Sequence, residues 1–155
     1  MESFLLHRAK PLIKMKRFFV SLLITVSVLS FAQQKPVREI YNYTTRNDAA
    51  LVKAKTDLFL LDVVSSGRFS VEPISSGSDH LDLFLVMPVE AGKIKSRVRY
   101  DFLKEGFVVS LSNSRLITKD NKTIKIDNEK DRNHSTILNS LKNLVFKAYE
   151  KEIYK

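Results

Sequence analysis

The stretch from Lys93 to Phe102 constrains the fold most, because apolar and charged residues alternate along it for ten positions. Successive side chains of a β-strand point to opposite faces of a sheet. One face of this strand would therefore be largely apolar, and the other would carry the cations Lys93, Lys95, Arg97 and Arg99. The alternation pauses at residues 104–106 and resumes in 107–112. This pattern predicts an antiparallel hairpin with one face on a core and the other in water.

Residues 49–65 predict an amphipathic, heavily buried helix. Apolar residues at spacings of three and four predict a buried stripe, made of Leu51, Ala54, Leu58 and Leu61 and widened by Phe59, Leu60 and Val63. Thr45 and Asp48 have the spacing of the N-cap and third residue of a capping box. Gly67 fits the position just after the helix end.

A second helix is expected near the C-terminus, with Asn133 or Ser135 as its N-cap. Its apolar residues recur on one side, and they are Ile137, Leu138, Leu141, Leu144, Val145 and Ala148. The other segments with strand-like patterns are 37–43, 68–74, 80–89, 115–118 and 123–126. Together these elements predict an α+β fold, an antiparallel sheet with two amphipathic helices on one face. The order along the chain would be β-α-β(4 or more)-α.

Residues 15–32 have the pattern of a secretory signal peptide. A basic region is followed by a short apolar run and then by small residues. This order predicts cleavage between Ala32 and Gln33. The uncharged run 18–34 is shorter than the roughly 20 residues that a spanning helix needs. We therefore expect export to the periplasm or the extracellular space and no stable membrane span after cleavage. A retained signal anchor is the alternative.

The signal pattern also sets the expected domain bounds. Met15 begins the signal pattern, so residues 1–14 are interpreted as an over-extended N-terminus, with a long n-region of the signal peptide as the alternative. Residues 33–152 would form a single α+β domain. The chain of 155 residues contains no cysteine, which excludes disulfides, thiolate metal sites and a cysteine nucleophile. No cofactor is expected, since the few glycines are dispersed and form no phosphate-binding loop.

Over about residues 37–152 the chain resembles an uncharacterised secreted family with a TATA-binding-protein-like (TBP-like) fold. The resemblance rests on the β-α-β(4)-α order and on residues 94–112, where a strand of alternating basic and apolar residues turns through Lys104, Glu105 and Gly106 into a second strand. It implies the sheet-and-two-helix architecture. It implies no catalytic residues, and DNA binding does not transfer with a fold.

The cationic strand face is the leading candidate for a binding site. Lys93, Lys95, Arg97 and Arg99 would attract an anionic envelope component or a protein partner. The alternative is that these charges only keep an exposed sheet face soluble and unpaired. We expect no aromatic residue to interleave with them on that face, which disfavours single-stranded nucleic acid. We therefore expect a non-catalytic binding domain that binds no nucleic acid.

Two other functions stay open. His80 and Asp82 would share one face of a strand and reach one ion or one substrate, as in a small hydrolase or metal-dependent enzyme. Two ligands do not make a tight metal site, so no metal is expected there. Alternatively, an apolar ligand such as a lipid would lie between the last helix and the sheet. The sequence does not predict the oligomeric state.

Overall fold

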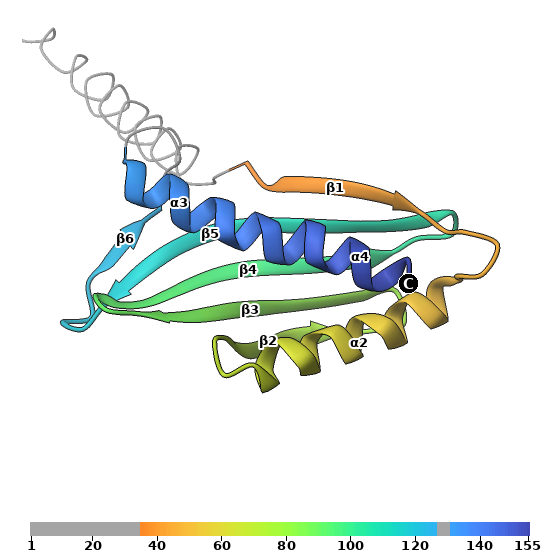
Figure 1. Ribbon diagram of the computed structural model, residues 1–155, viewed down its shortest axis with the longest axis horizontal. Helices are drawn as coiled ribbons and strands as arrows, with labels where there is room; N and C mark the ends of the chain where they lie inside the picture. The colour runs from red at the N-terminus through yellow and green to blue at the C-terminus, as the bar shows by residue number, and fades with distance from the viewer. Residues whose placement is uncertain (1–34, 127–130) are drawn as a thin grey trace, which may run out of the picture. The chain divides into compact units, whose positions relative to one another are not determined.

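The strand with the alternating pattern of residues 93–102 lies at the centre of the sheet. The computed structural model describes residues 35–126 and 131–155. In this part of the chain, six strands form one antiparallel sheet, with the order β1-β5-β4-β3-β2 and with β6 paired to β5 (Figure 1). The strands are β1 (Val37–Asn42), β2 (Ser70–Ser76), β3 (His80–Val89), β4 (Gly92–Phe102), β5 (Gly106–Thr118) and β6 (Thr123–Lys125).

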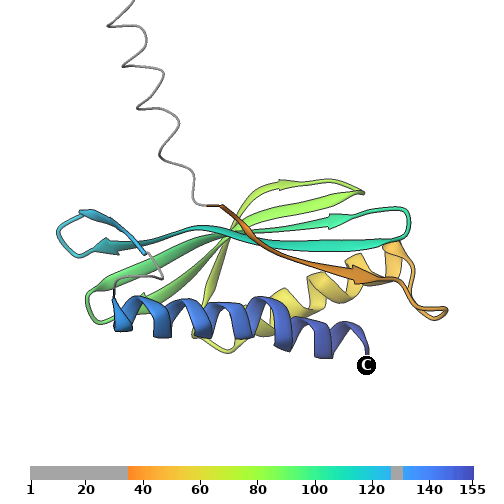
Figure 2. The ribbon, with the colours of Figure 1, turned by 90° about the horizontal axis from the view of Figure 1, so that it is seen from above.

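Both helices cover the same face of this sheet. The first is α2 (Ala49–Ser65), and the second is a continuous helical run of α3 (Arg132–Lys142), the π-helical η1 (Asn143–Ala148) and α4 (Tyr149–Ile153). Seen from above, the two helices lie on one side of the strands (Figure 2). The predicted α+β class, the antiparallel sheet and the single helical layer are therefore confirmed.

Tyr149 is the residue at which both helices meet the sheet. Its side chain is fully buried, and its hydroxyl lies 2.8 Å from the hydroxyl of Thr56 in α2. Its ring contacts Phe59 edge-on at 5.3 Å between centroids and Tyr100 of β4 at 5.0 Å. Aromatic contacts of this kind add to the free energy gained by burial alone. The contacts of Tyr149 thus fix both helices to the face of β4 that carries the apolar residues.

The burial predicted for α2 is confirmed at Phe59 and Val63, but the four-residue stripe at its centre is wrong. Leu58 and Leu61 are 63% and 61% exposed, and Leu51 and Ala54 are also exposed. The buried residues lie on a different side of the helix, and they are Val52, Thr56, Phe59 and Val63. Because α2 carries apolar residues on most of its circumference, spacing alone did not identify the buried side.

The predicted helix caps are also corrected. The carboxylate of Asp48 accepts a hydrogen bond from the backbone N–H of Leu51 at 2.8 Å, so Asp48 and not Thr45 is the N-cap of α2. Asp131 caps α3 by accepting from the N–H of Asn133 at 2.8 Å, in place of the expected Asn133 or Ser135. An aspartate oxygen satisfies these otherwise unpaired N–H groups as a serine or threonine would.

The π-helical segment explains why the stripe of the last helix was only partly right. Leu138, Leu141 and Val145 are buried as predicted, but Ala148 is exposed. A π turn bonds residue i to i+5 and so holds an additional residue. The side chains beyond η1 are shifted, and Tyr149 and Ile153 face the core.

The hairpin formed by β4 and β5 contains a bulge. Lys95 pairs with Arg115 but Arg97 pairs with Ser112, so β5 has one more residue than β4 between these pairs. Asn113 takes a positive φ of 51° within this bulge. As a result β5 continues to Thr118, and the separate strand predicted at 115–118 is its last part.

Three predictions concern segments outside the described residues. They are the signal peptide 15–32, its cleavage site at Ala32 and Gln33, and the over-extended N-terminus 1–14. The described residues from 35 onward belong to one compact unit. Among the helices of this part, none combines the length and the apolar character needed to cross a membrane.

Candidate functional site

The four predicted cations project from one face of β4, opposite the helices. Ile94, Val98 and Tyr100 point into the core and are at most 1% exposed, so the residues that alternate with them point the other way. We call this surface the open face. The antiparallel registers bring neighbouring strands onto it as well, since Asp82 of β3 lies opposite Arg99 and Phe84 opposite Arg97.

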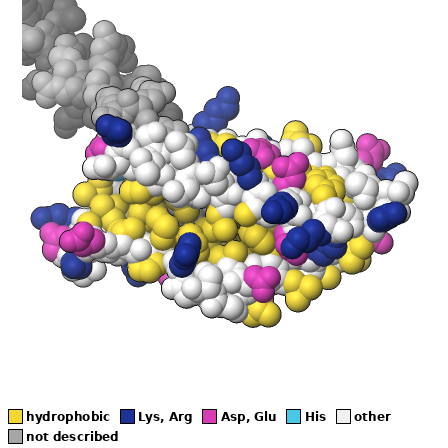
Figure 3. Space-filling model, in the orientation of Figure 1, with side chains coloured by type: hydrophobic (Ala, Val, Ile, Leu, Met, Phe, Trp, Pro, Cys, Tyr) yellow, Lys and Arg dark blue, Asp and Glu magenta, His cyan; other side chains and the backbone are white. Residues whose placement is uncertain are grey.

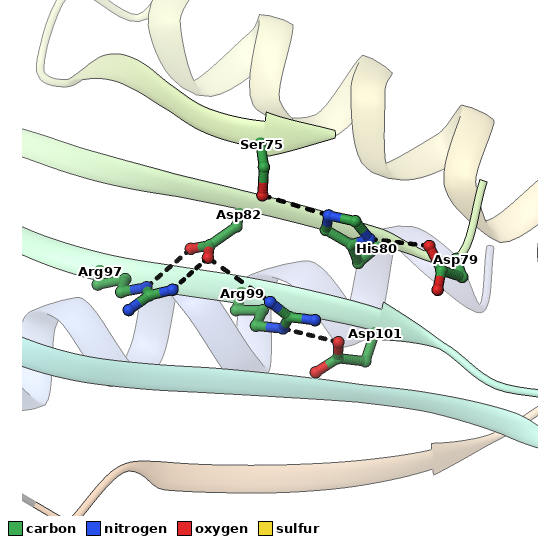
Figure 4. A network of polar contacts seen from close by, with 7 residues as sticks. All are labelled: Ser75, Asp79, His80, Asp82, Arg97, Arg99 and Asp101. Carbon is green, nitrogen blue, oxygen red and sulfur yellow. Dashed lines mark hydrogen bonds and ion pairs between the residues drawn. The ribbon is translucent and has the colours of Figure 1, made fainter. Parts of the chain in front are cut away.

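Asp82 is the buried charged residue of the open face within the described part of the chain. Its side chain is only 2% exposed. Both of its carboxylate oxygens bind Arg97, with Nε donating to Oδ1 at 2.9 Å and Nη2 donating to Oδ2 at 2.5 Å (Figure 4). The hydrogen bonds from Arg97 and the nearby charge of Arg99 lower the pKa of Asp82 below its usual range, against the effect of burial. Asp82 is therefore an ionised group that holds the Arg97 guanidinium in one orientation.

The other cations differ in how far they are neutralised. Arg99 donates from Nε to Asp101 at 2.7 Å, and its Nη1 lies 3.7 Å from Asp82 (Figure 4). Lys95 forms an ion pair with Glu72 of β2, which lowers the pKa of Glu72. Lys93 is exposed, and no ion pair within residues 35–126 and 131–155 involves it.

Two residues that the sequence analysis missed belong to the open face. One of them is Phe84, so the expectation that no aromatic side chain lies among these cations is wrong. Phe84 of β3 lies beneath Lys95, whose Nζ is 4.2 Å from the ring centroid, and the Arg115 guanidinium is 5.8 Å away. The β5 bulge turns Arg115 to this face, while Ser114 turns to the core and accepts a hydrogen bond from Ser96. The Nε of Arg115 is buried with no hydrogen-bond partner within the described residues. Cross-strand pairing placed these residues here, so no local pattern predicted them.

The pair predicted as an enzymatic site is not joined in the structure. His80 and Asp82 do share the open face, but His80 binds Asp79 through Nδ1 at 2.8 Å and Ser75 through Nε2 at 3.2 Å (Figure 4). Asp82 is occupied by Arg97 instead. Among the described residues, no group of three or more histidine and carboxylate side chains is arranged to hold a metal ion.

The contacts of His80 follow the order of a serine-hydrolase relay, in which one ring nitrogen faces a carboxylate and the other a hydroxyl. Such a relay also needs donors for the oxyanion. The nearby N–H of Gly77 donates to the carbonyl of His80 at 2.9 Å and is therefore engaged. Asp79 is 79% exposed, so water screens its interaction with the imidazole. His80 therefore has the two partners of such a relay, while the neighbouring Gly77 N–H is already bonded.

A second surface feature lies on the helical side. Figure 3 shows hydrophobic side chains gathered over the strands between the two helices. A hollow of about 220 Å³, including the solvent at its mouth, lies there. It is lined by Phe59, Leu60, Val63, Leu83, Leu85, Val98, Tyr100, Leu144 and Val145. The enclosed space of this hollow, about 10 Å³, is barely that needed for one water molecule, whereas pockets for drug-sized ligands measure roughly 300–1,000 Å³.

Comparison with known proteins does not assign the chain to a family. No protein-family model matches the sequence, and no curated protein matches it. Among solved structures, the crystal structure of the vertebrate conserved region of human METTL16 aligns with 77% of this chain and 98% of that chain, at 9% identity and a TM-score of 0.46. At this level of similarity the match carries no inference about function.

Proposed function

We propose that this protein is a non-catalytic binding domain whose open face binds an anionic partner. The observation that carries the proposal is the pair Arg97 and Arg99, whose side chains are each 40% exposed although carboxylates hold them from one side. Lys93 and Arg115 add positive charge nearby. Fixed cations with exposed N–H groups attract anions and lose little conformational entropy on binding.

Export and family membership belong to the same proposal. The signal-peptide pattern of residues 15–32 would deliver the domain to the periplasm or the cell exterior, where the partner would be an anionic envelope component. The antiparallel sheet with one helical layer is compatible with the secreted TBP-like family that the sequence resembles. That family supplies no catalytic residue, in keeping with a binding function.

The test is a pull-down from an envelope extract with the immobilised full chain. The variant Lys93→Glu/Arg99→Glu reverses two cations of the open face and spares Arg97, the partner of the buried Asp82. The control Lys147→Glu/Lys151→Glu makes the same change in net charge at two exposed lysines of the last helix. We expect an anionic species, identified by mass spectrometry, to be lost only from the open-face variant. Equal retention by both variants would refute the proposal.

An apolar-ligand carrier is the second candidate, favoured by the hollow between the helices. Leu60 and Leu144 line it and are partly exposed. A Leu60→Trp substitution would fill the hollow, whereas Leu61→Trp would add the same bulk at an exposed position of the same helix. If the protein carries lipid, native mass spectrometry should find lipid with wild type and Leu61→Trp but not with Leu60→Trp. A ligand-free wild-type spectrum would count against this function.

A further inference from the structure

In both Arg97 and Arg99, some N–H groups of the guanidinium bind a carboxylate of the protein and others do not. Arg97 uses Nε and Nη2 for Asp82, so neither hydrogen bond to that carboxylate involves Nη1. Arg99 uses Nε for Asp101, and its Nη1 lies toward Asp82 at 3.7 Å. The N–H groups not used in these contacts remain on side chains that are 40% exposed. A guanidinium has five N–H donors in a fixed plane, so holding one edge also orients the other.

The spacing of the two arginines places both groups within reach of one ligand. They are two residues apart on β4 and therefore share a face, at roughly 7 Å along the strand. Side chains as long as arginine span that separation easily when they converge on one group. Asp82 lies between them and contacts both (Figure 4).

We infer that Arg97 and Arg99 form a subsite for a single oxyanion group, a phosphate, sulfate or carboxylate, and that Asp82 is the positioning residue that orients Arg97 toward it. This inference rests on the proposed binding function and names the chemistry that the open face recognises. Guanidinium groups suit these anions because two parallel N–H donors match two oxygens of the ligand.

If Asp82 positions Arg97, removing its charge should weaken anion binding, whereas net charge alone predicts tighter binding. Replacing Asp82 with Asn removes a negative charge from the open face. If the face attracted anions through net charge alone, this change would tighten binding. If Asp82 orients Arg97, the same change loosens the guanidinium and weakens binding. Glu72→Gln is the matched control, since it removes the same charge from the same face, and within residues 35–126 and 131–155 the ion pair of Glu72 is with Lys95 and not with either arginine.

The experiment measures binding of the full chain to three polyanion probes of different chemistry. Vesicles containing phosphatidylglycerol present lipid phosphate, dextran sulfate presents sulfate, and polygalacturonate presents carboxylate. The probe that binds wild type most tightly identifies the source of the oxyanion. On that probe, we expect Asp82→Asn to bind about tenfold more weakly, as for the loss of one charge-assisted hydrogen bond. Glu72→Gln should bind as tightly as wild type or more tightly.

Arg97→Lys provides a test that does not depend on folding of the Asp82 variant. It keeps the charge but removes the two-point geometry, so it should also weaken binding several-fold. Tight binding by a folded Asp82→Asn, or wild-type binding by Arg97→Lys, would overturn the inference. In either case binding that still disappears in Lys93→Glu/Arg99→Glu would leave the proposed function intact. Binding that survives in that double variant would refute the proposed function itself.

Discussion

Asp82 and Arg97 form a two-point ion pair in which the carboxylate is 2% exposed and the guanidinium is 40% exposed. The two partners therefore differ in what they lose when the other is removed. Without Asp82, the Arg97 side chain can turn into water. Without Arg97, a buried carboxylate keeps only Arg99, whose Nη1 is 3.7 Å away.

The first prediction follows from this asymmetry. Arg97→Ala should lower the free energy of unfolding by about 3–5 kcal/mol, because it leaves a buried charge without its main partner. Asp82→Ala should cost less. Urea denaturation of both variants measures the difference, and the double variant should recover part of the loss from Arg97→Ala alone. Equal costs for the two single variants would show that the carboxylate is well hydrated.

The second prediction concerns acid. The pKa of Asp82 is lowered in the folded protein, and the ordinary value is about 3.9. Its ionised form therefore stabilises the fold fully above pH of about 4, and the stabilisation disappears as the pH falls through the lowered value. The free energy of unfolding should fall below pH 4, and it should fall less in Asp82→Asn. Parallel pH curves for the two proteins would contradict the assignment.

The third prediction separates the two sides of α2. Leu58 is 63% exposed and Phe59 is 8% exposed. Leu58→Lys should change the free energy of unfolding by no more than about 0.5 kcal/mol, as is usual for surface sites. Phe59→Ala should cost about 3–5 kcal/mol through the cavity that it leaves beside Tyr149. Thermal and chemical unfolding of both variants provide the measurement. A large loss in Leu58→Lys would mean that this side is covered in solution.

The fourth prediction concerns Gly106, where β5 begins. A Cβ atom added there would lie 2.1 Å from the backbone oxygen of Tyr41 in β1. Gly106→Ala should therefore push β1 away from β5 and cost about 1–3 kcal/mol. Hydrogen exchange of the β1 amides should accelerate more than that of β3 and β4. Glu105→Ala changes the exposed neighbouring residue and should leave the exchange of β1 as in wild type.

The open face was predictable where the pattern is local. Alternation along residues 93–102 predicted the four cations on one side, because side-chain direction in a strand depends only on position. Their partners were not predictable in the same way. Glu72 and Asp82 come from other strands, and which cation each one meets depends on the cross-strand register.

For the helices, the sequence predicted that they exist but not which side of α2 is buried. The class of fold followed from two amphipathic segments around a run of strands. On α2, however, the exposed Leu58 and Leu61 fit helical spacing as well as the buried residues do, and the buried set includes the polar Thr56. The hydroxyl of Thr56 is satisfied by the carbonyl of Val52 and by Tyr149. Only the packed structure supplies the tyrosine partner, so the polar core position was not apparent from periodicity.

Because of the bulge, β5 contains one extra residue without a change in the face to which its later side chains point. A regular strand of the same length would turn Arg115 toward the core, because Ser112 and Arg115 are three residues apart and face the same way only through the bulge. A chain lacking Asn113 would keep Ser112 and Arg115 on their present face and lose only the irregularity. In evolutionary terms, position 113 is where this strand can gain or lose a residue without exchanging its two surfaces.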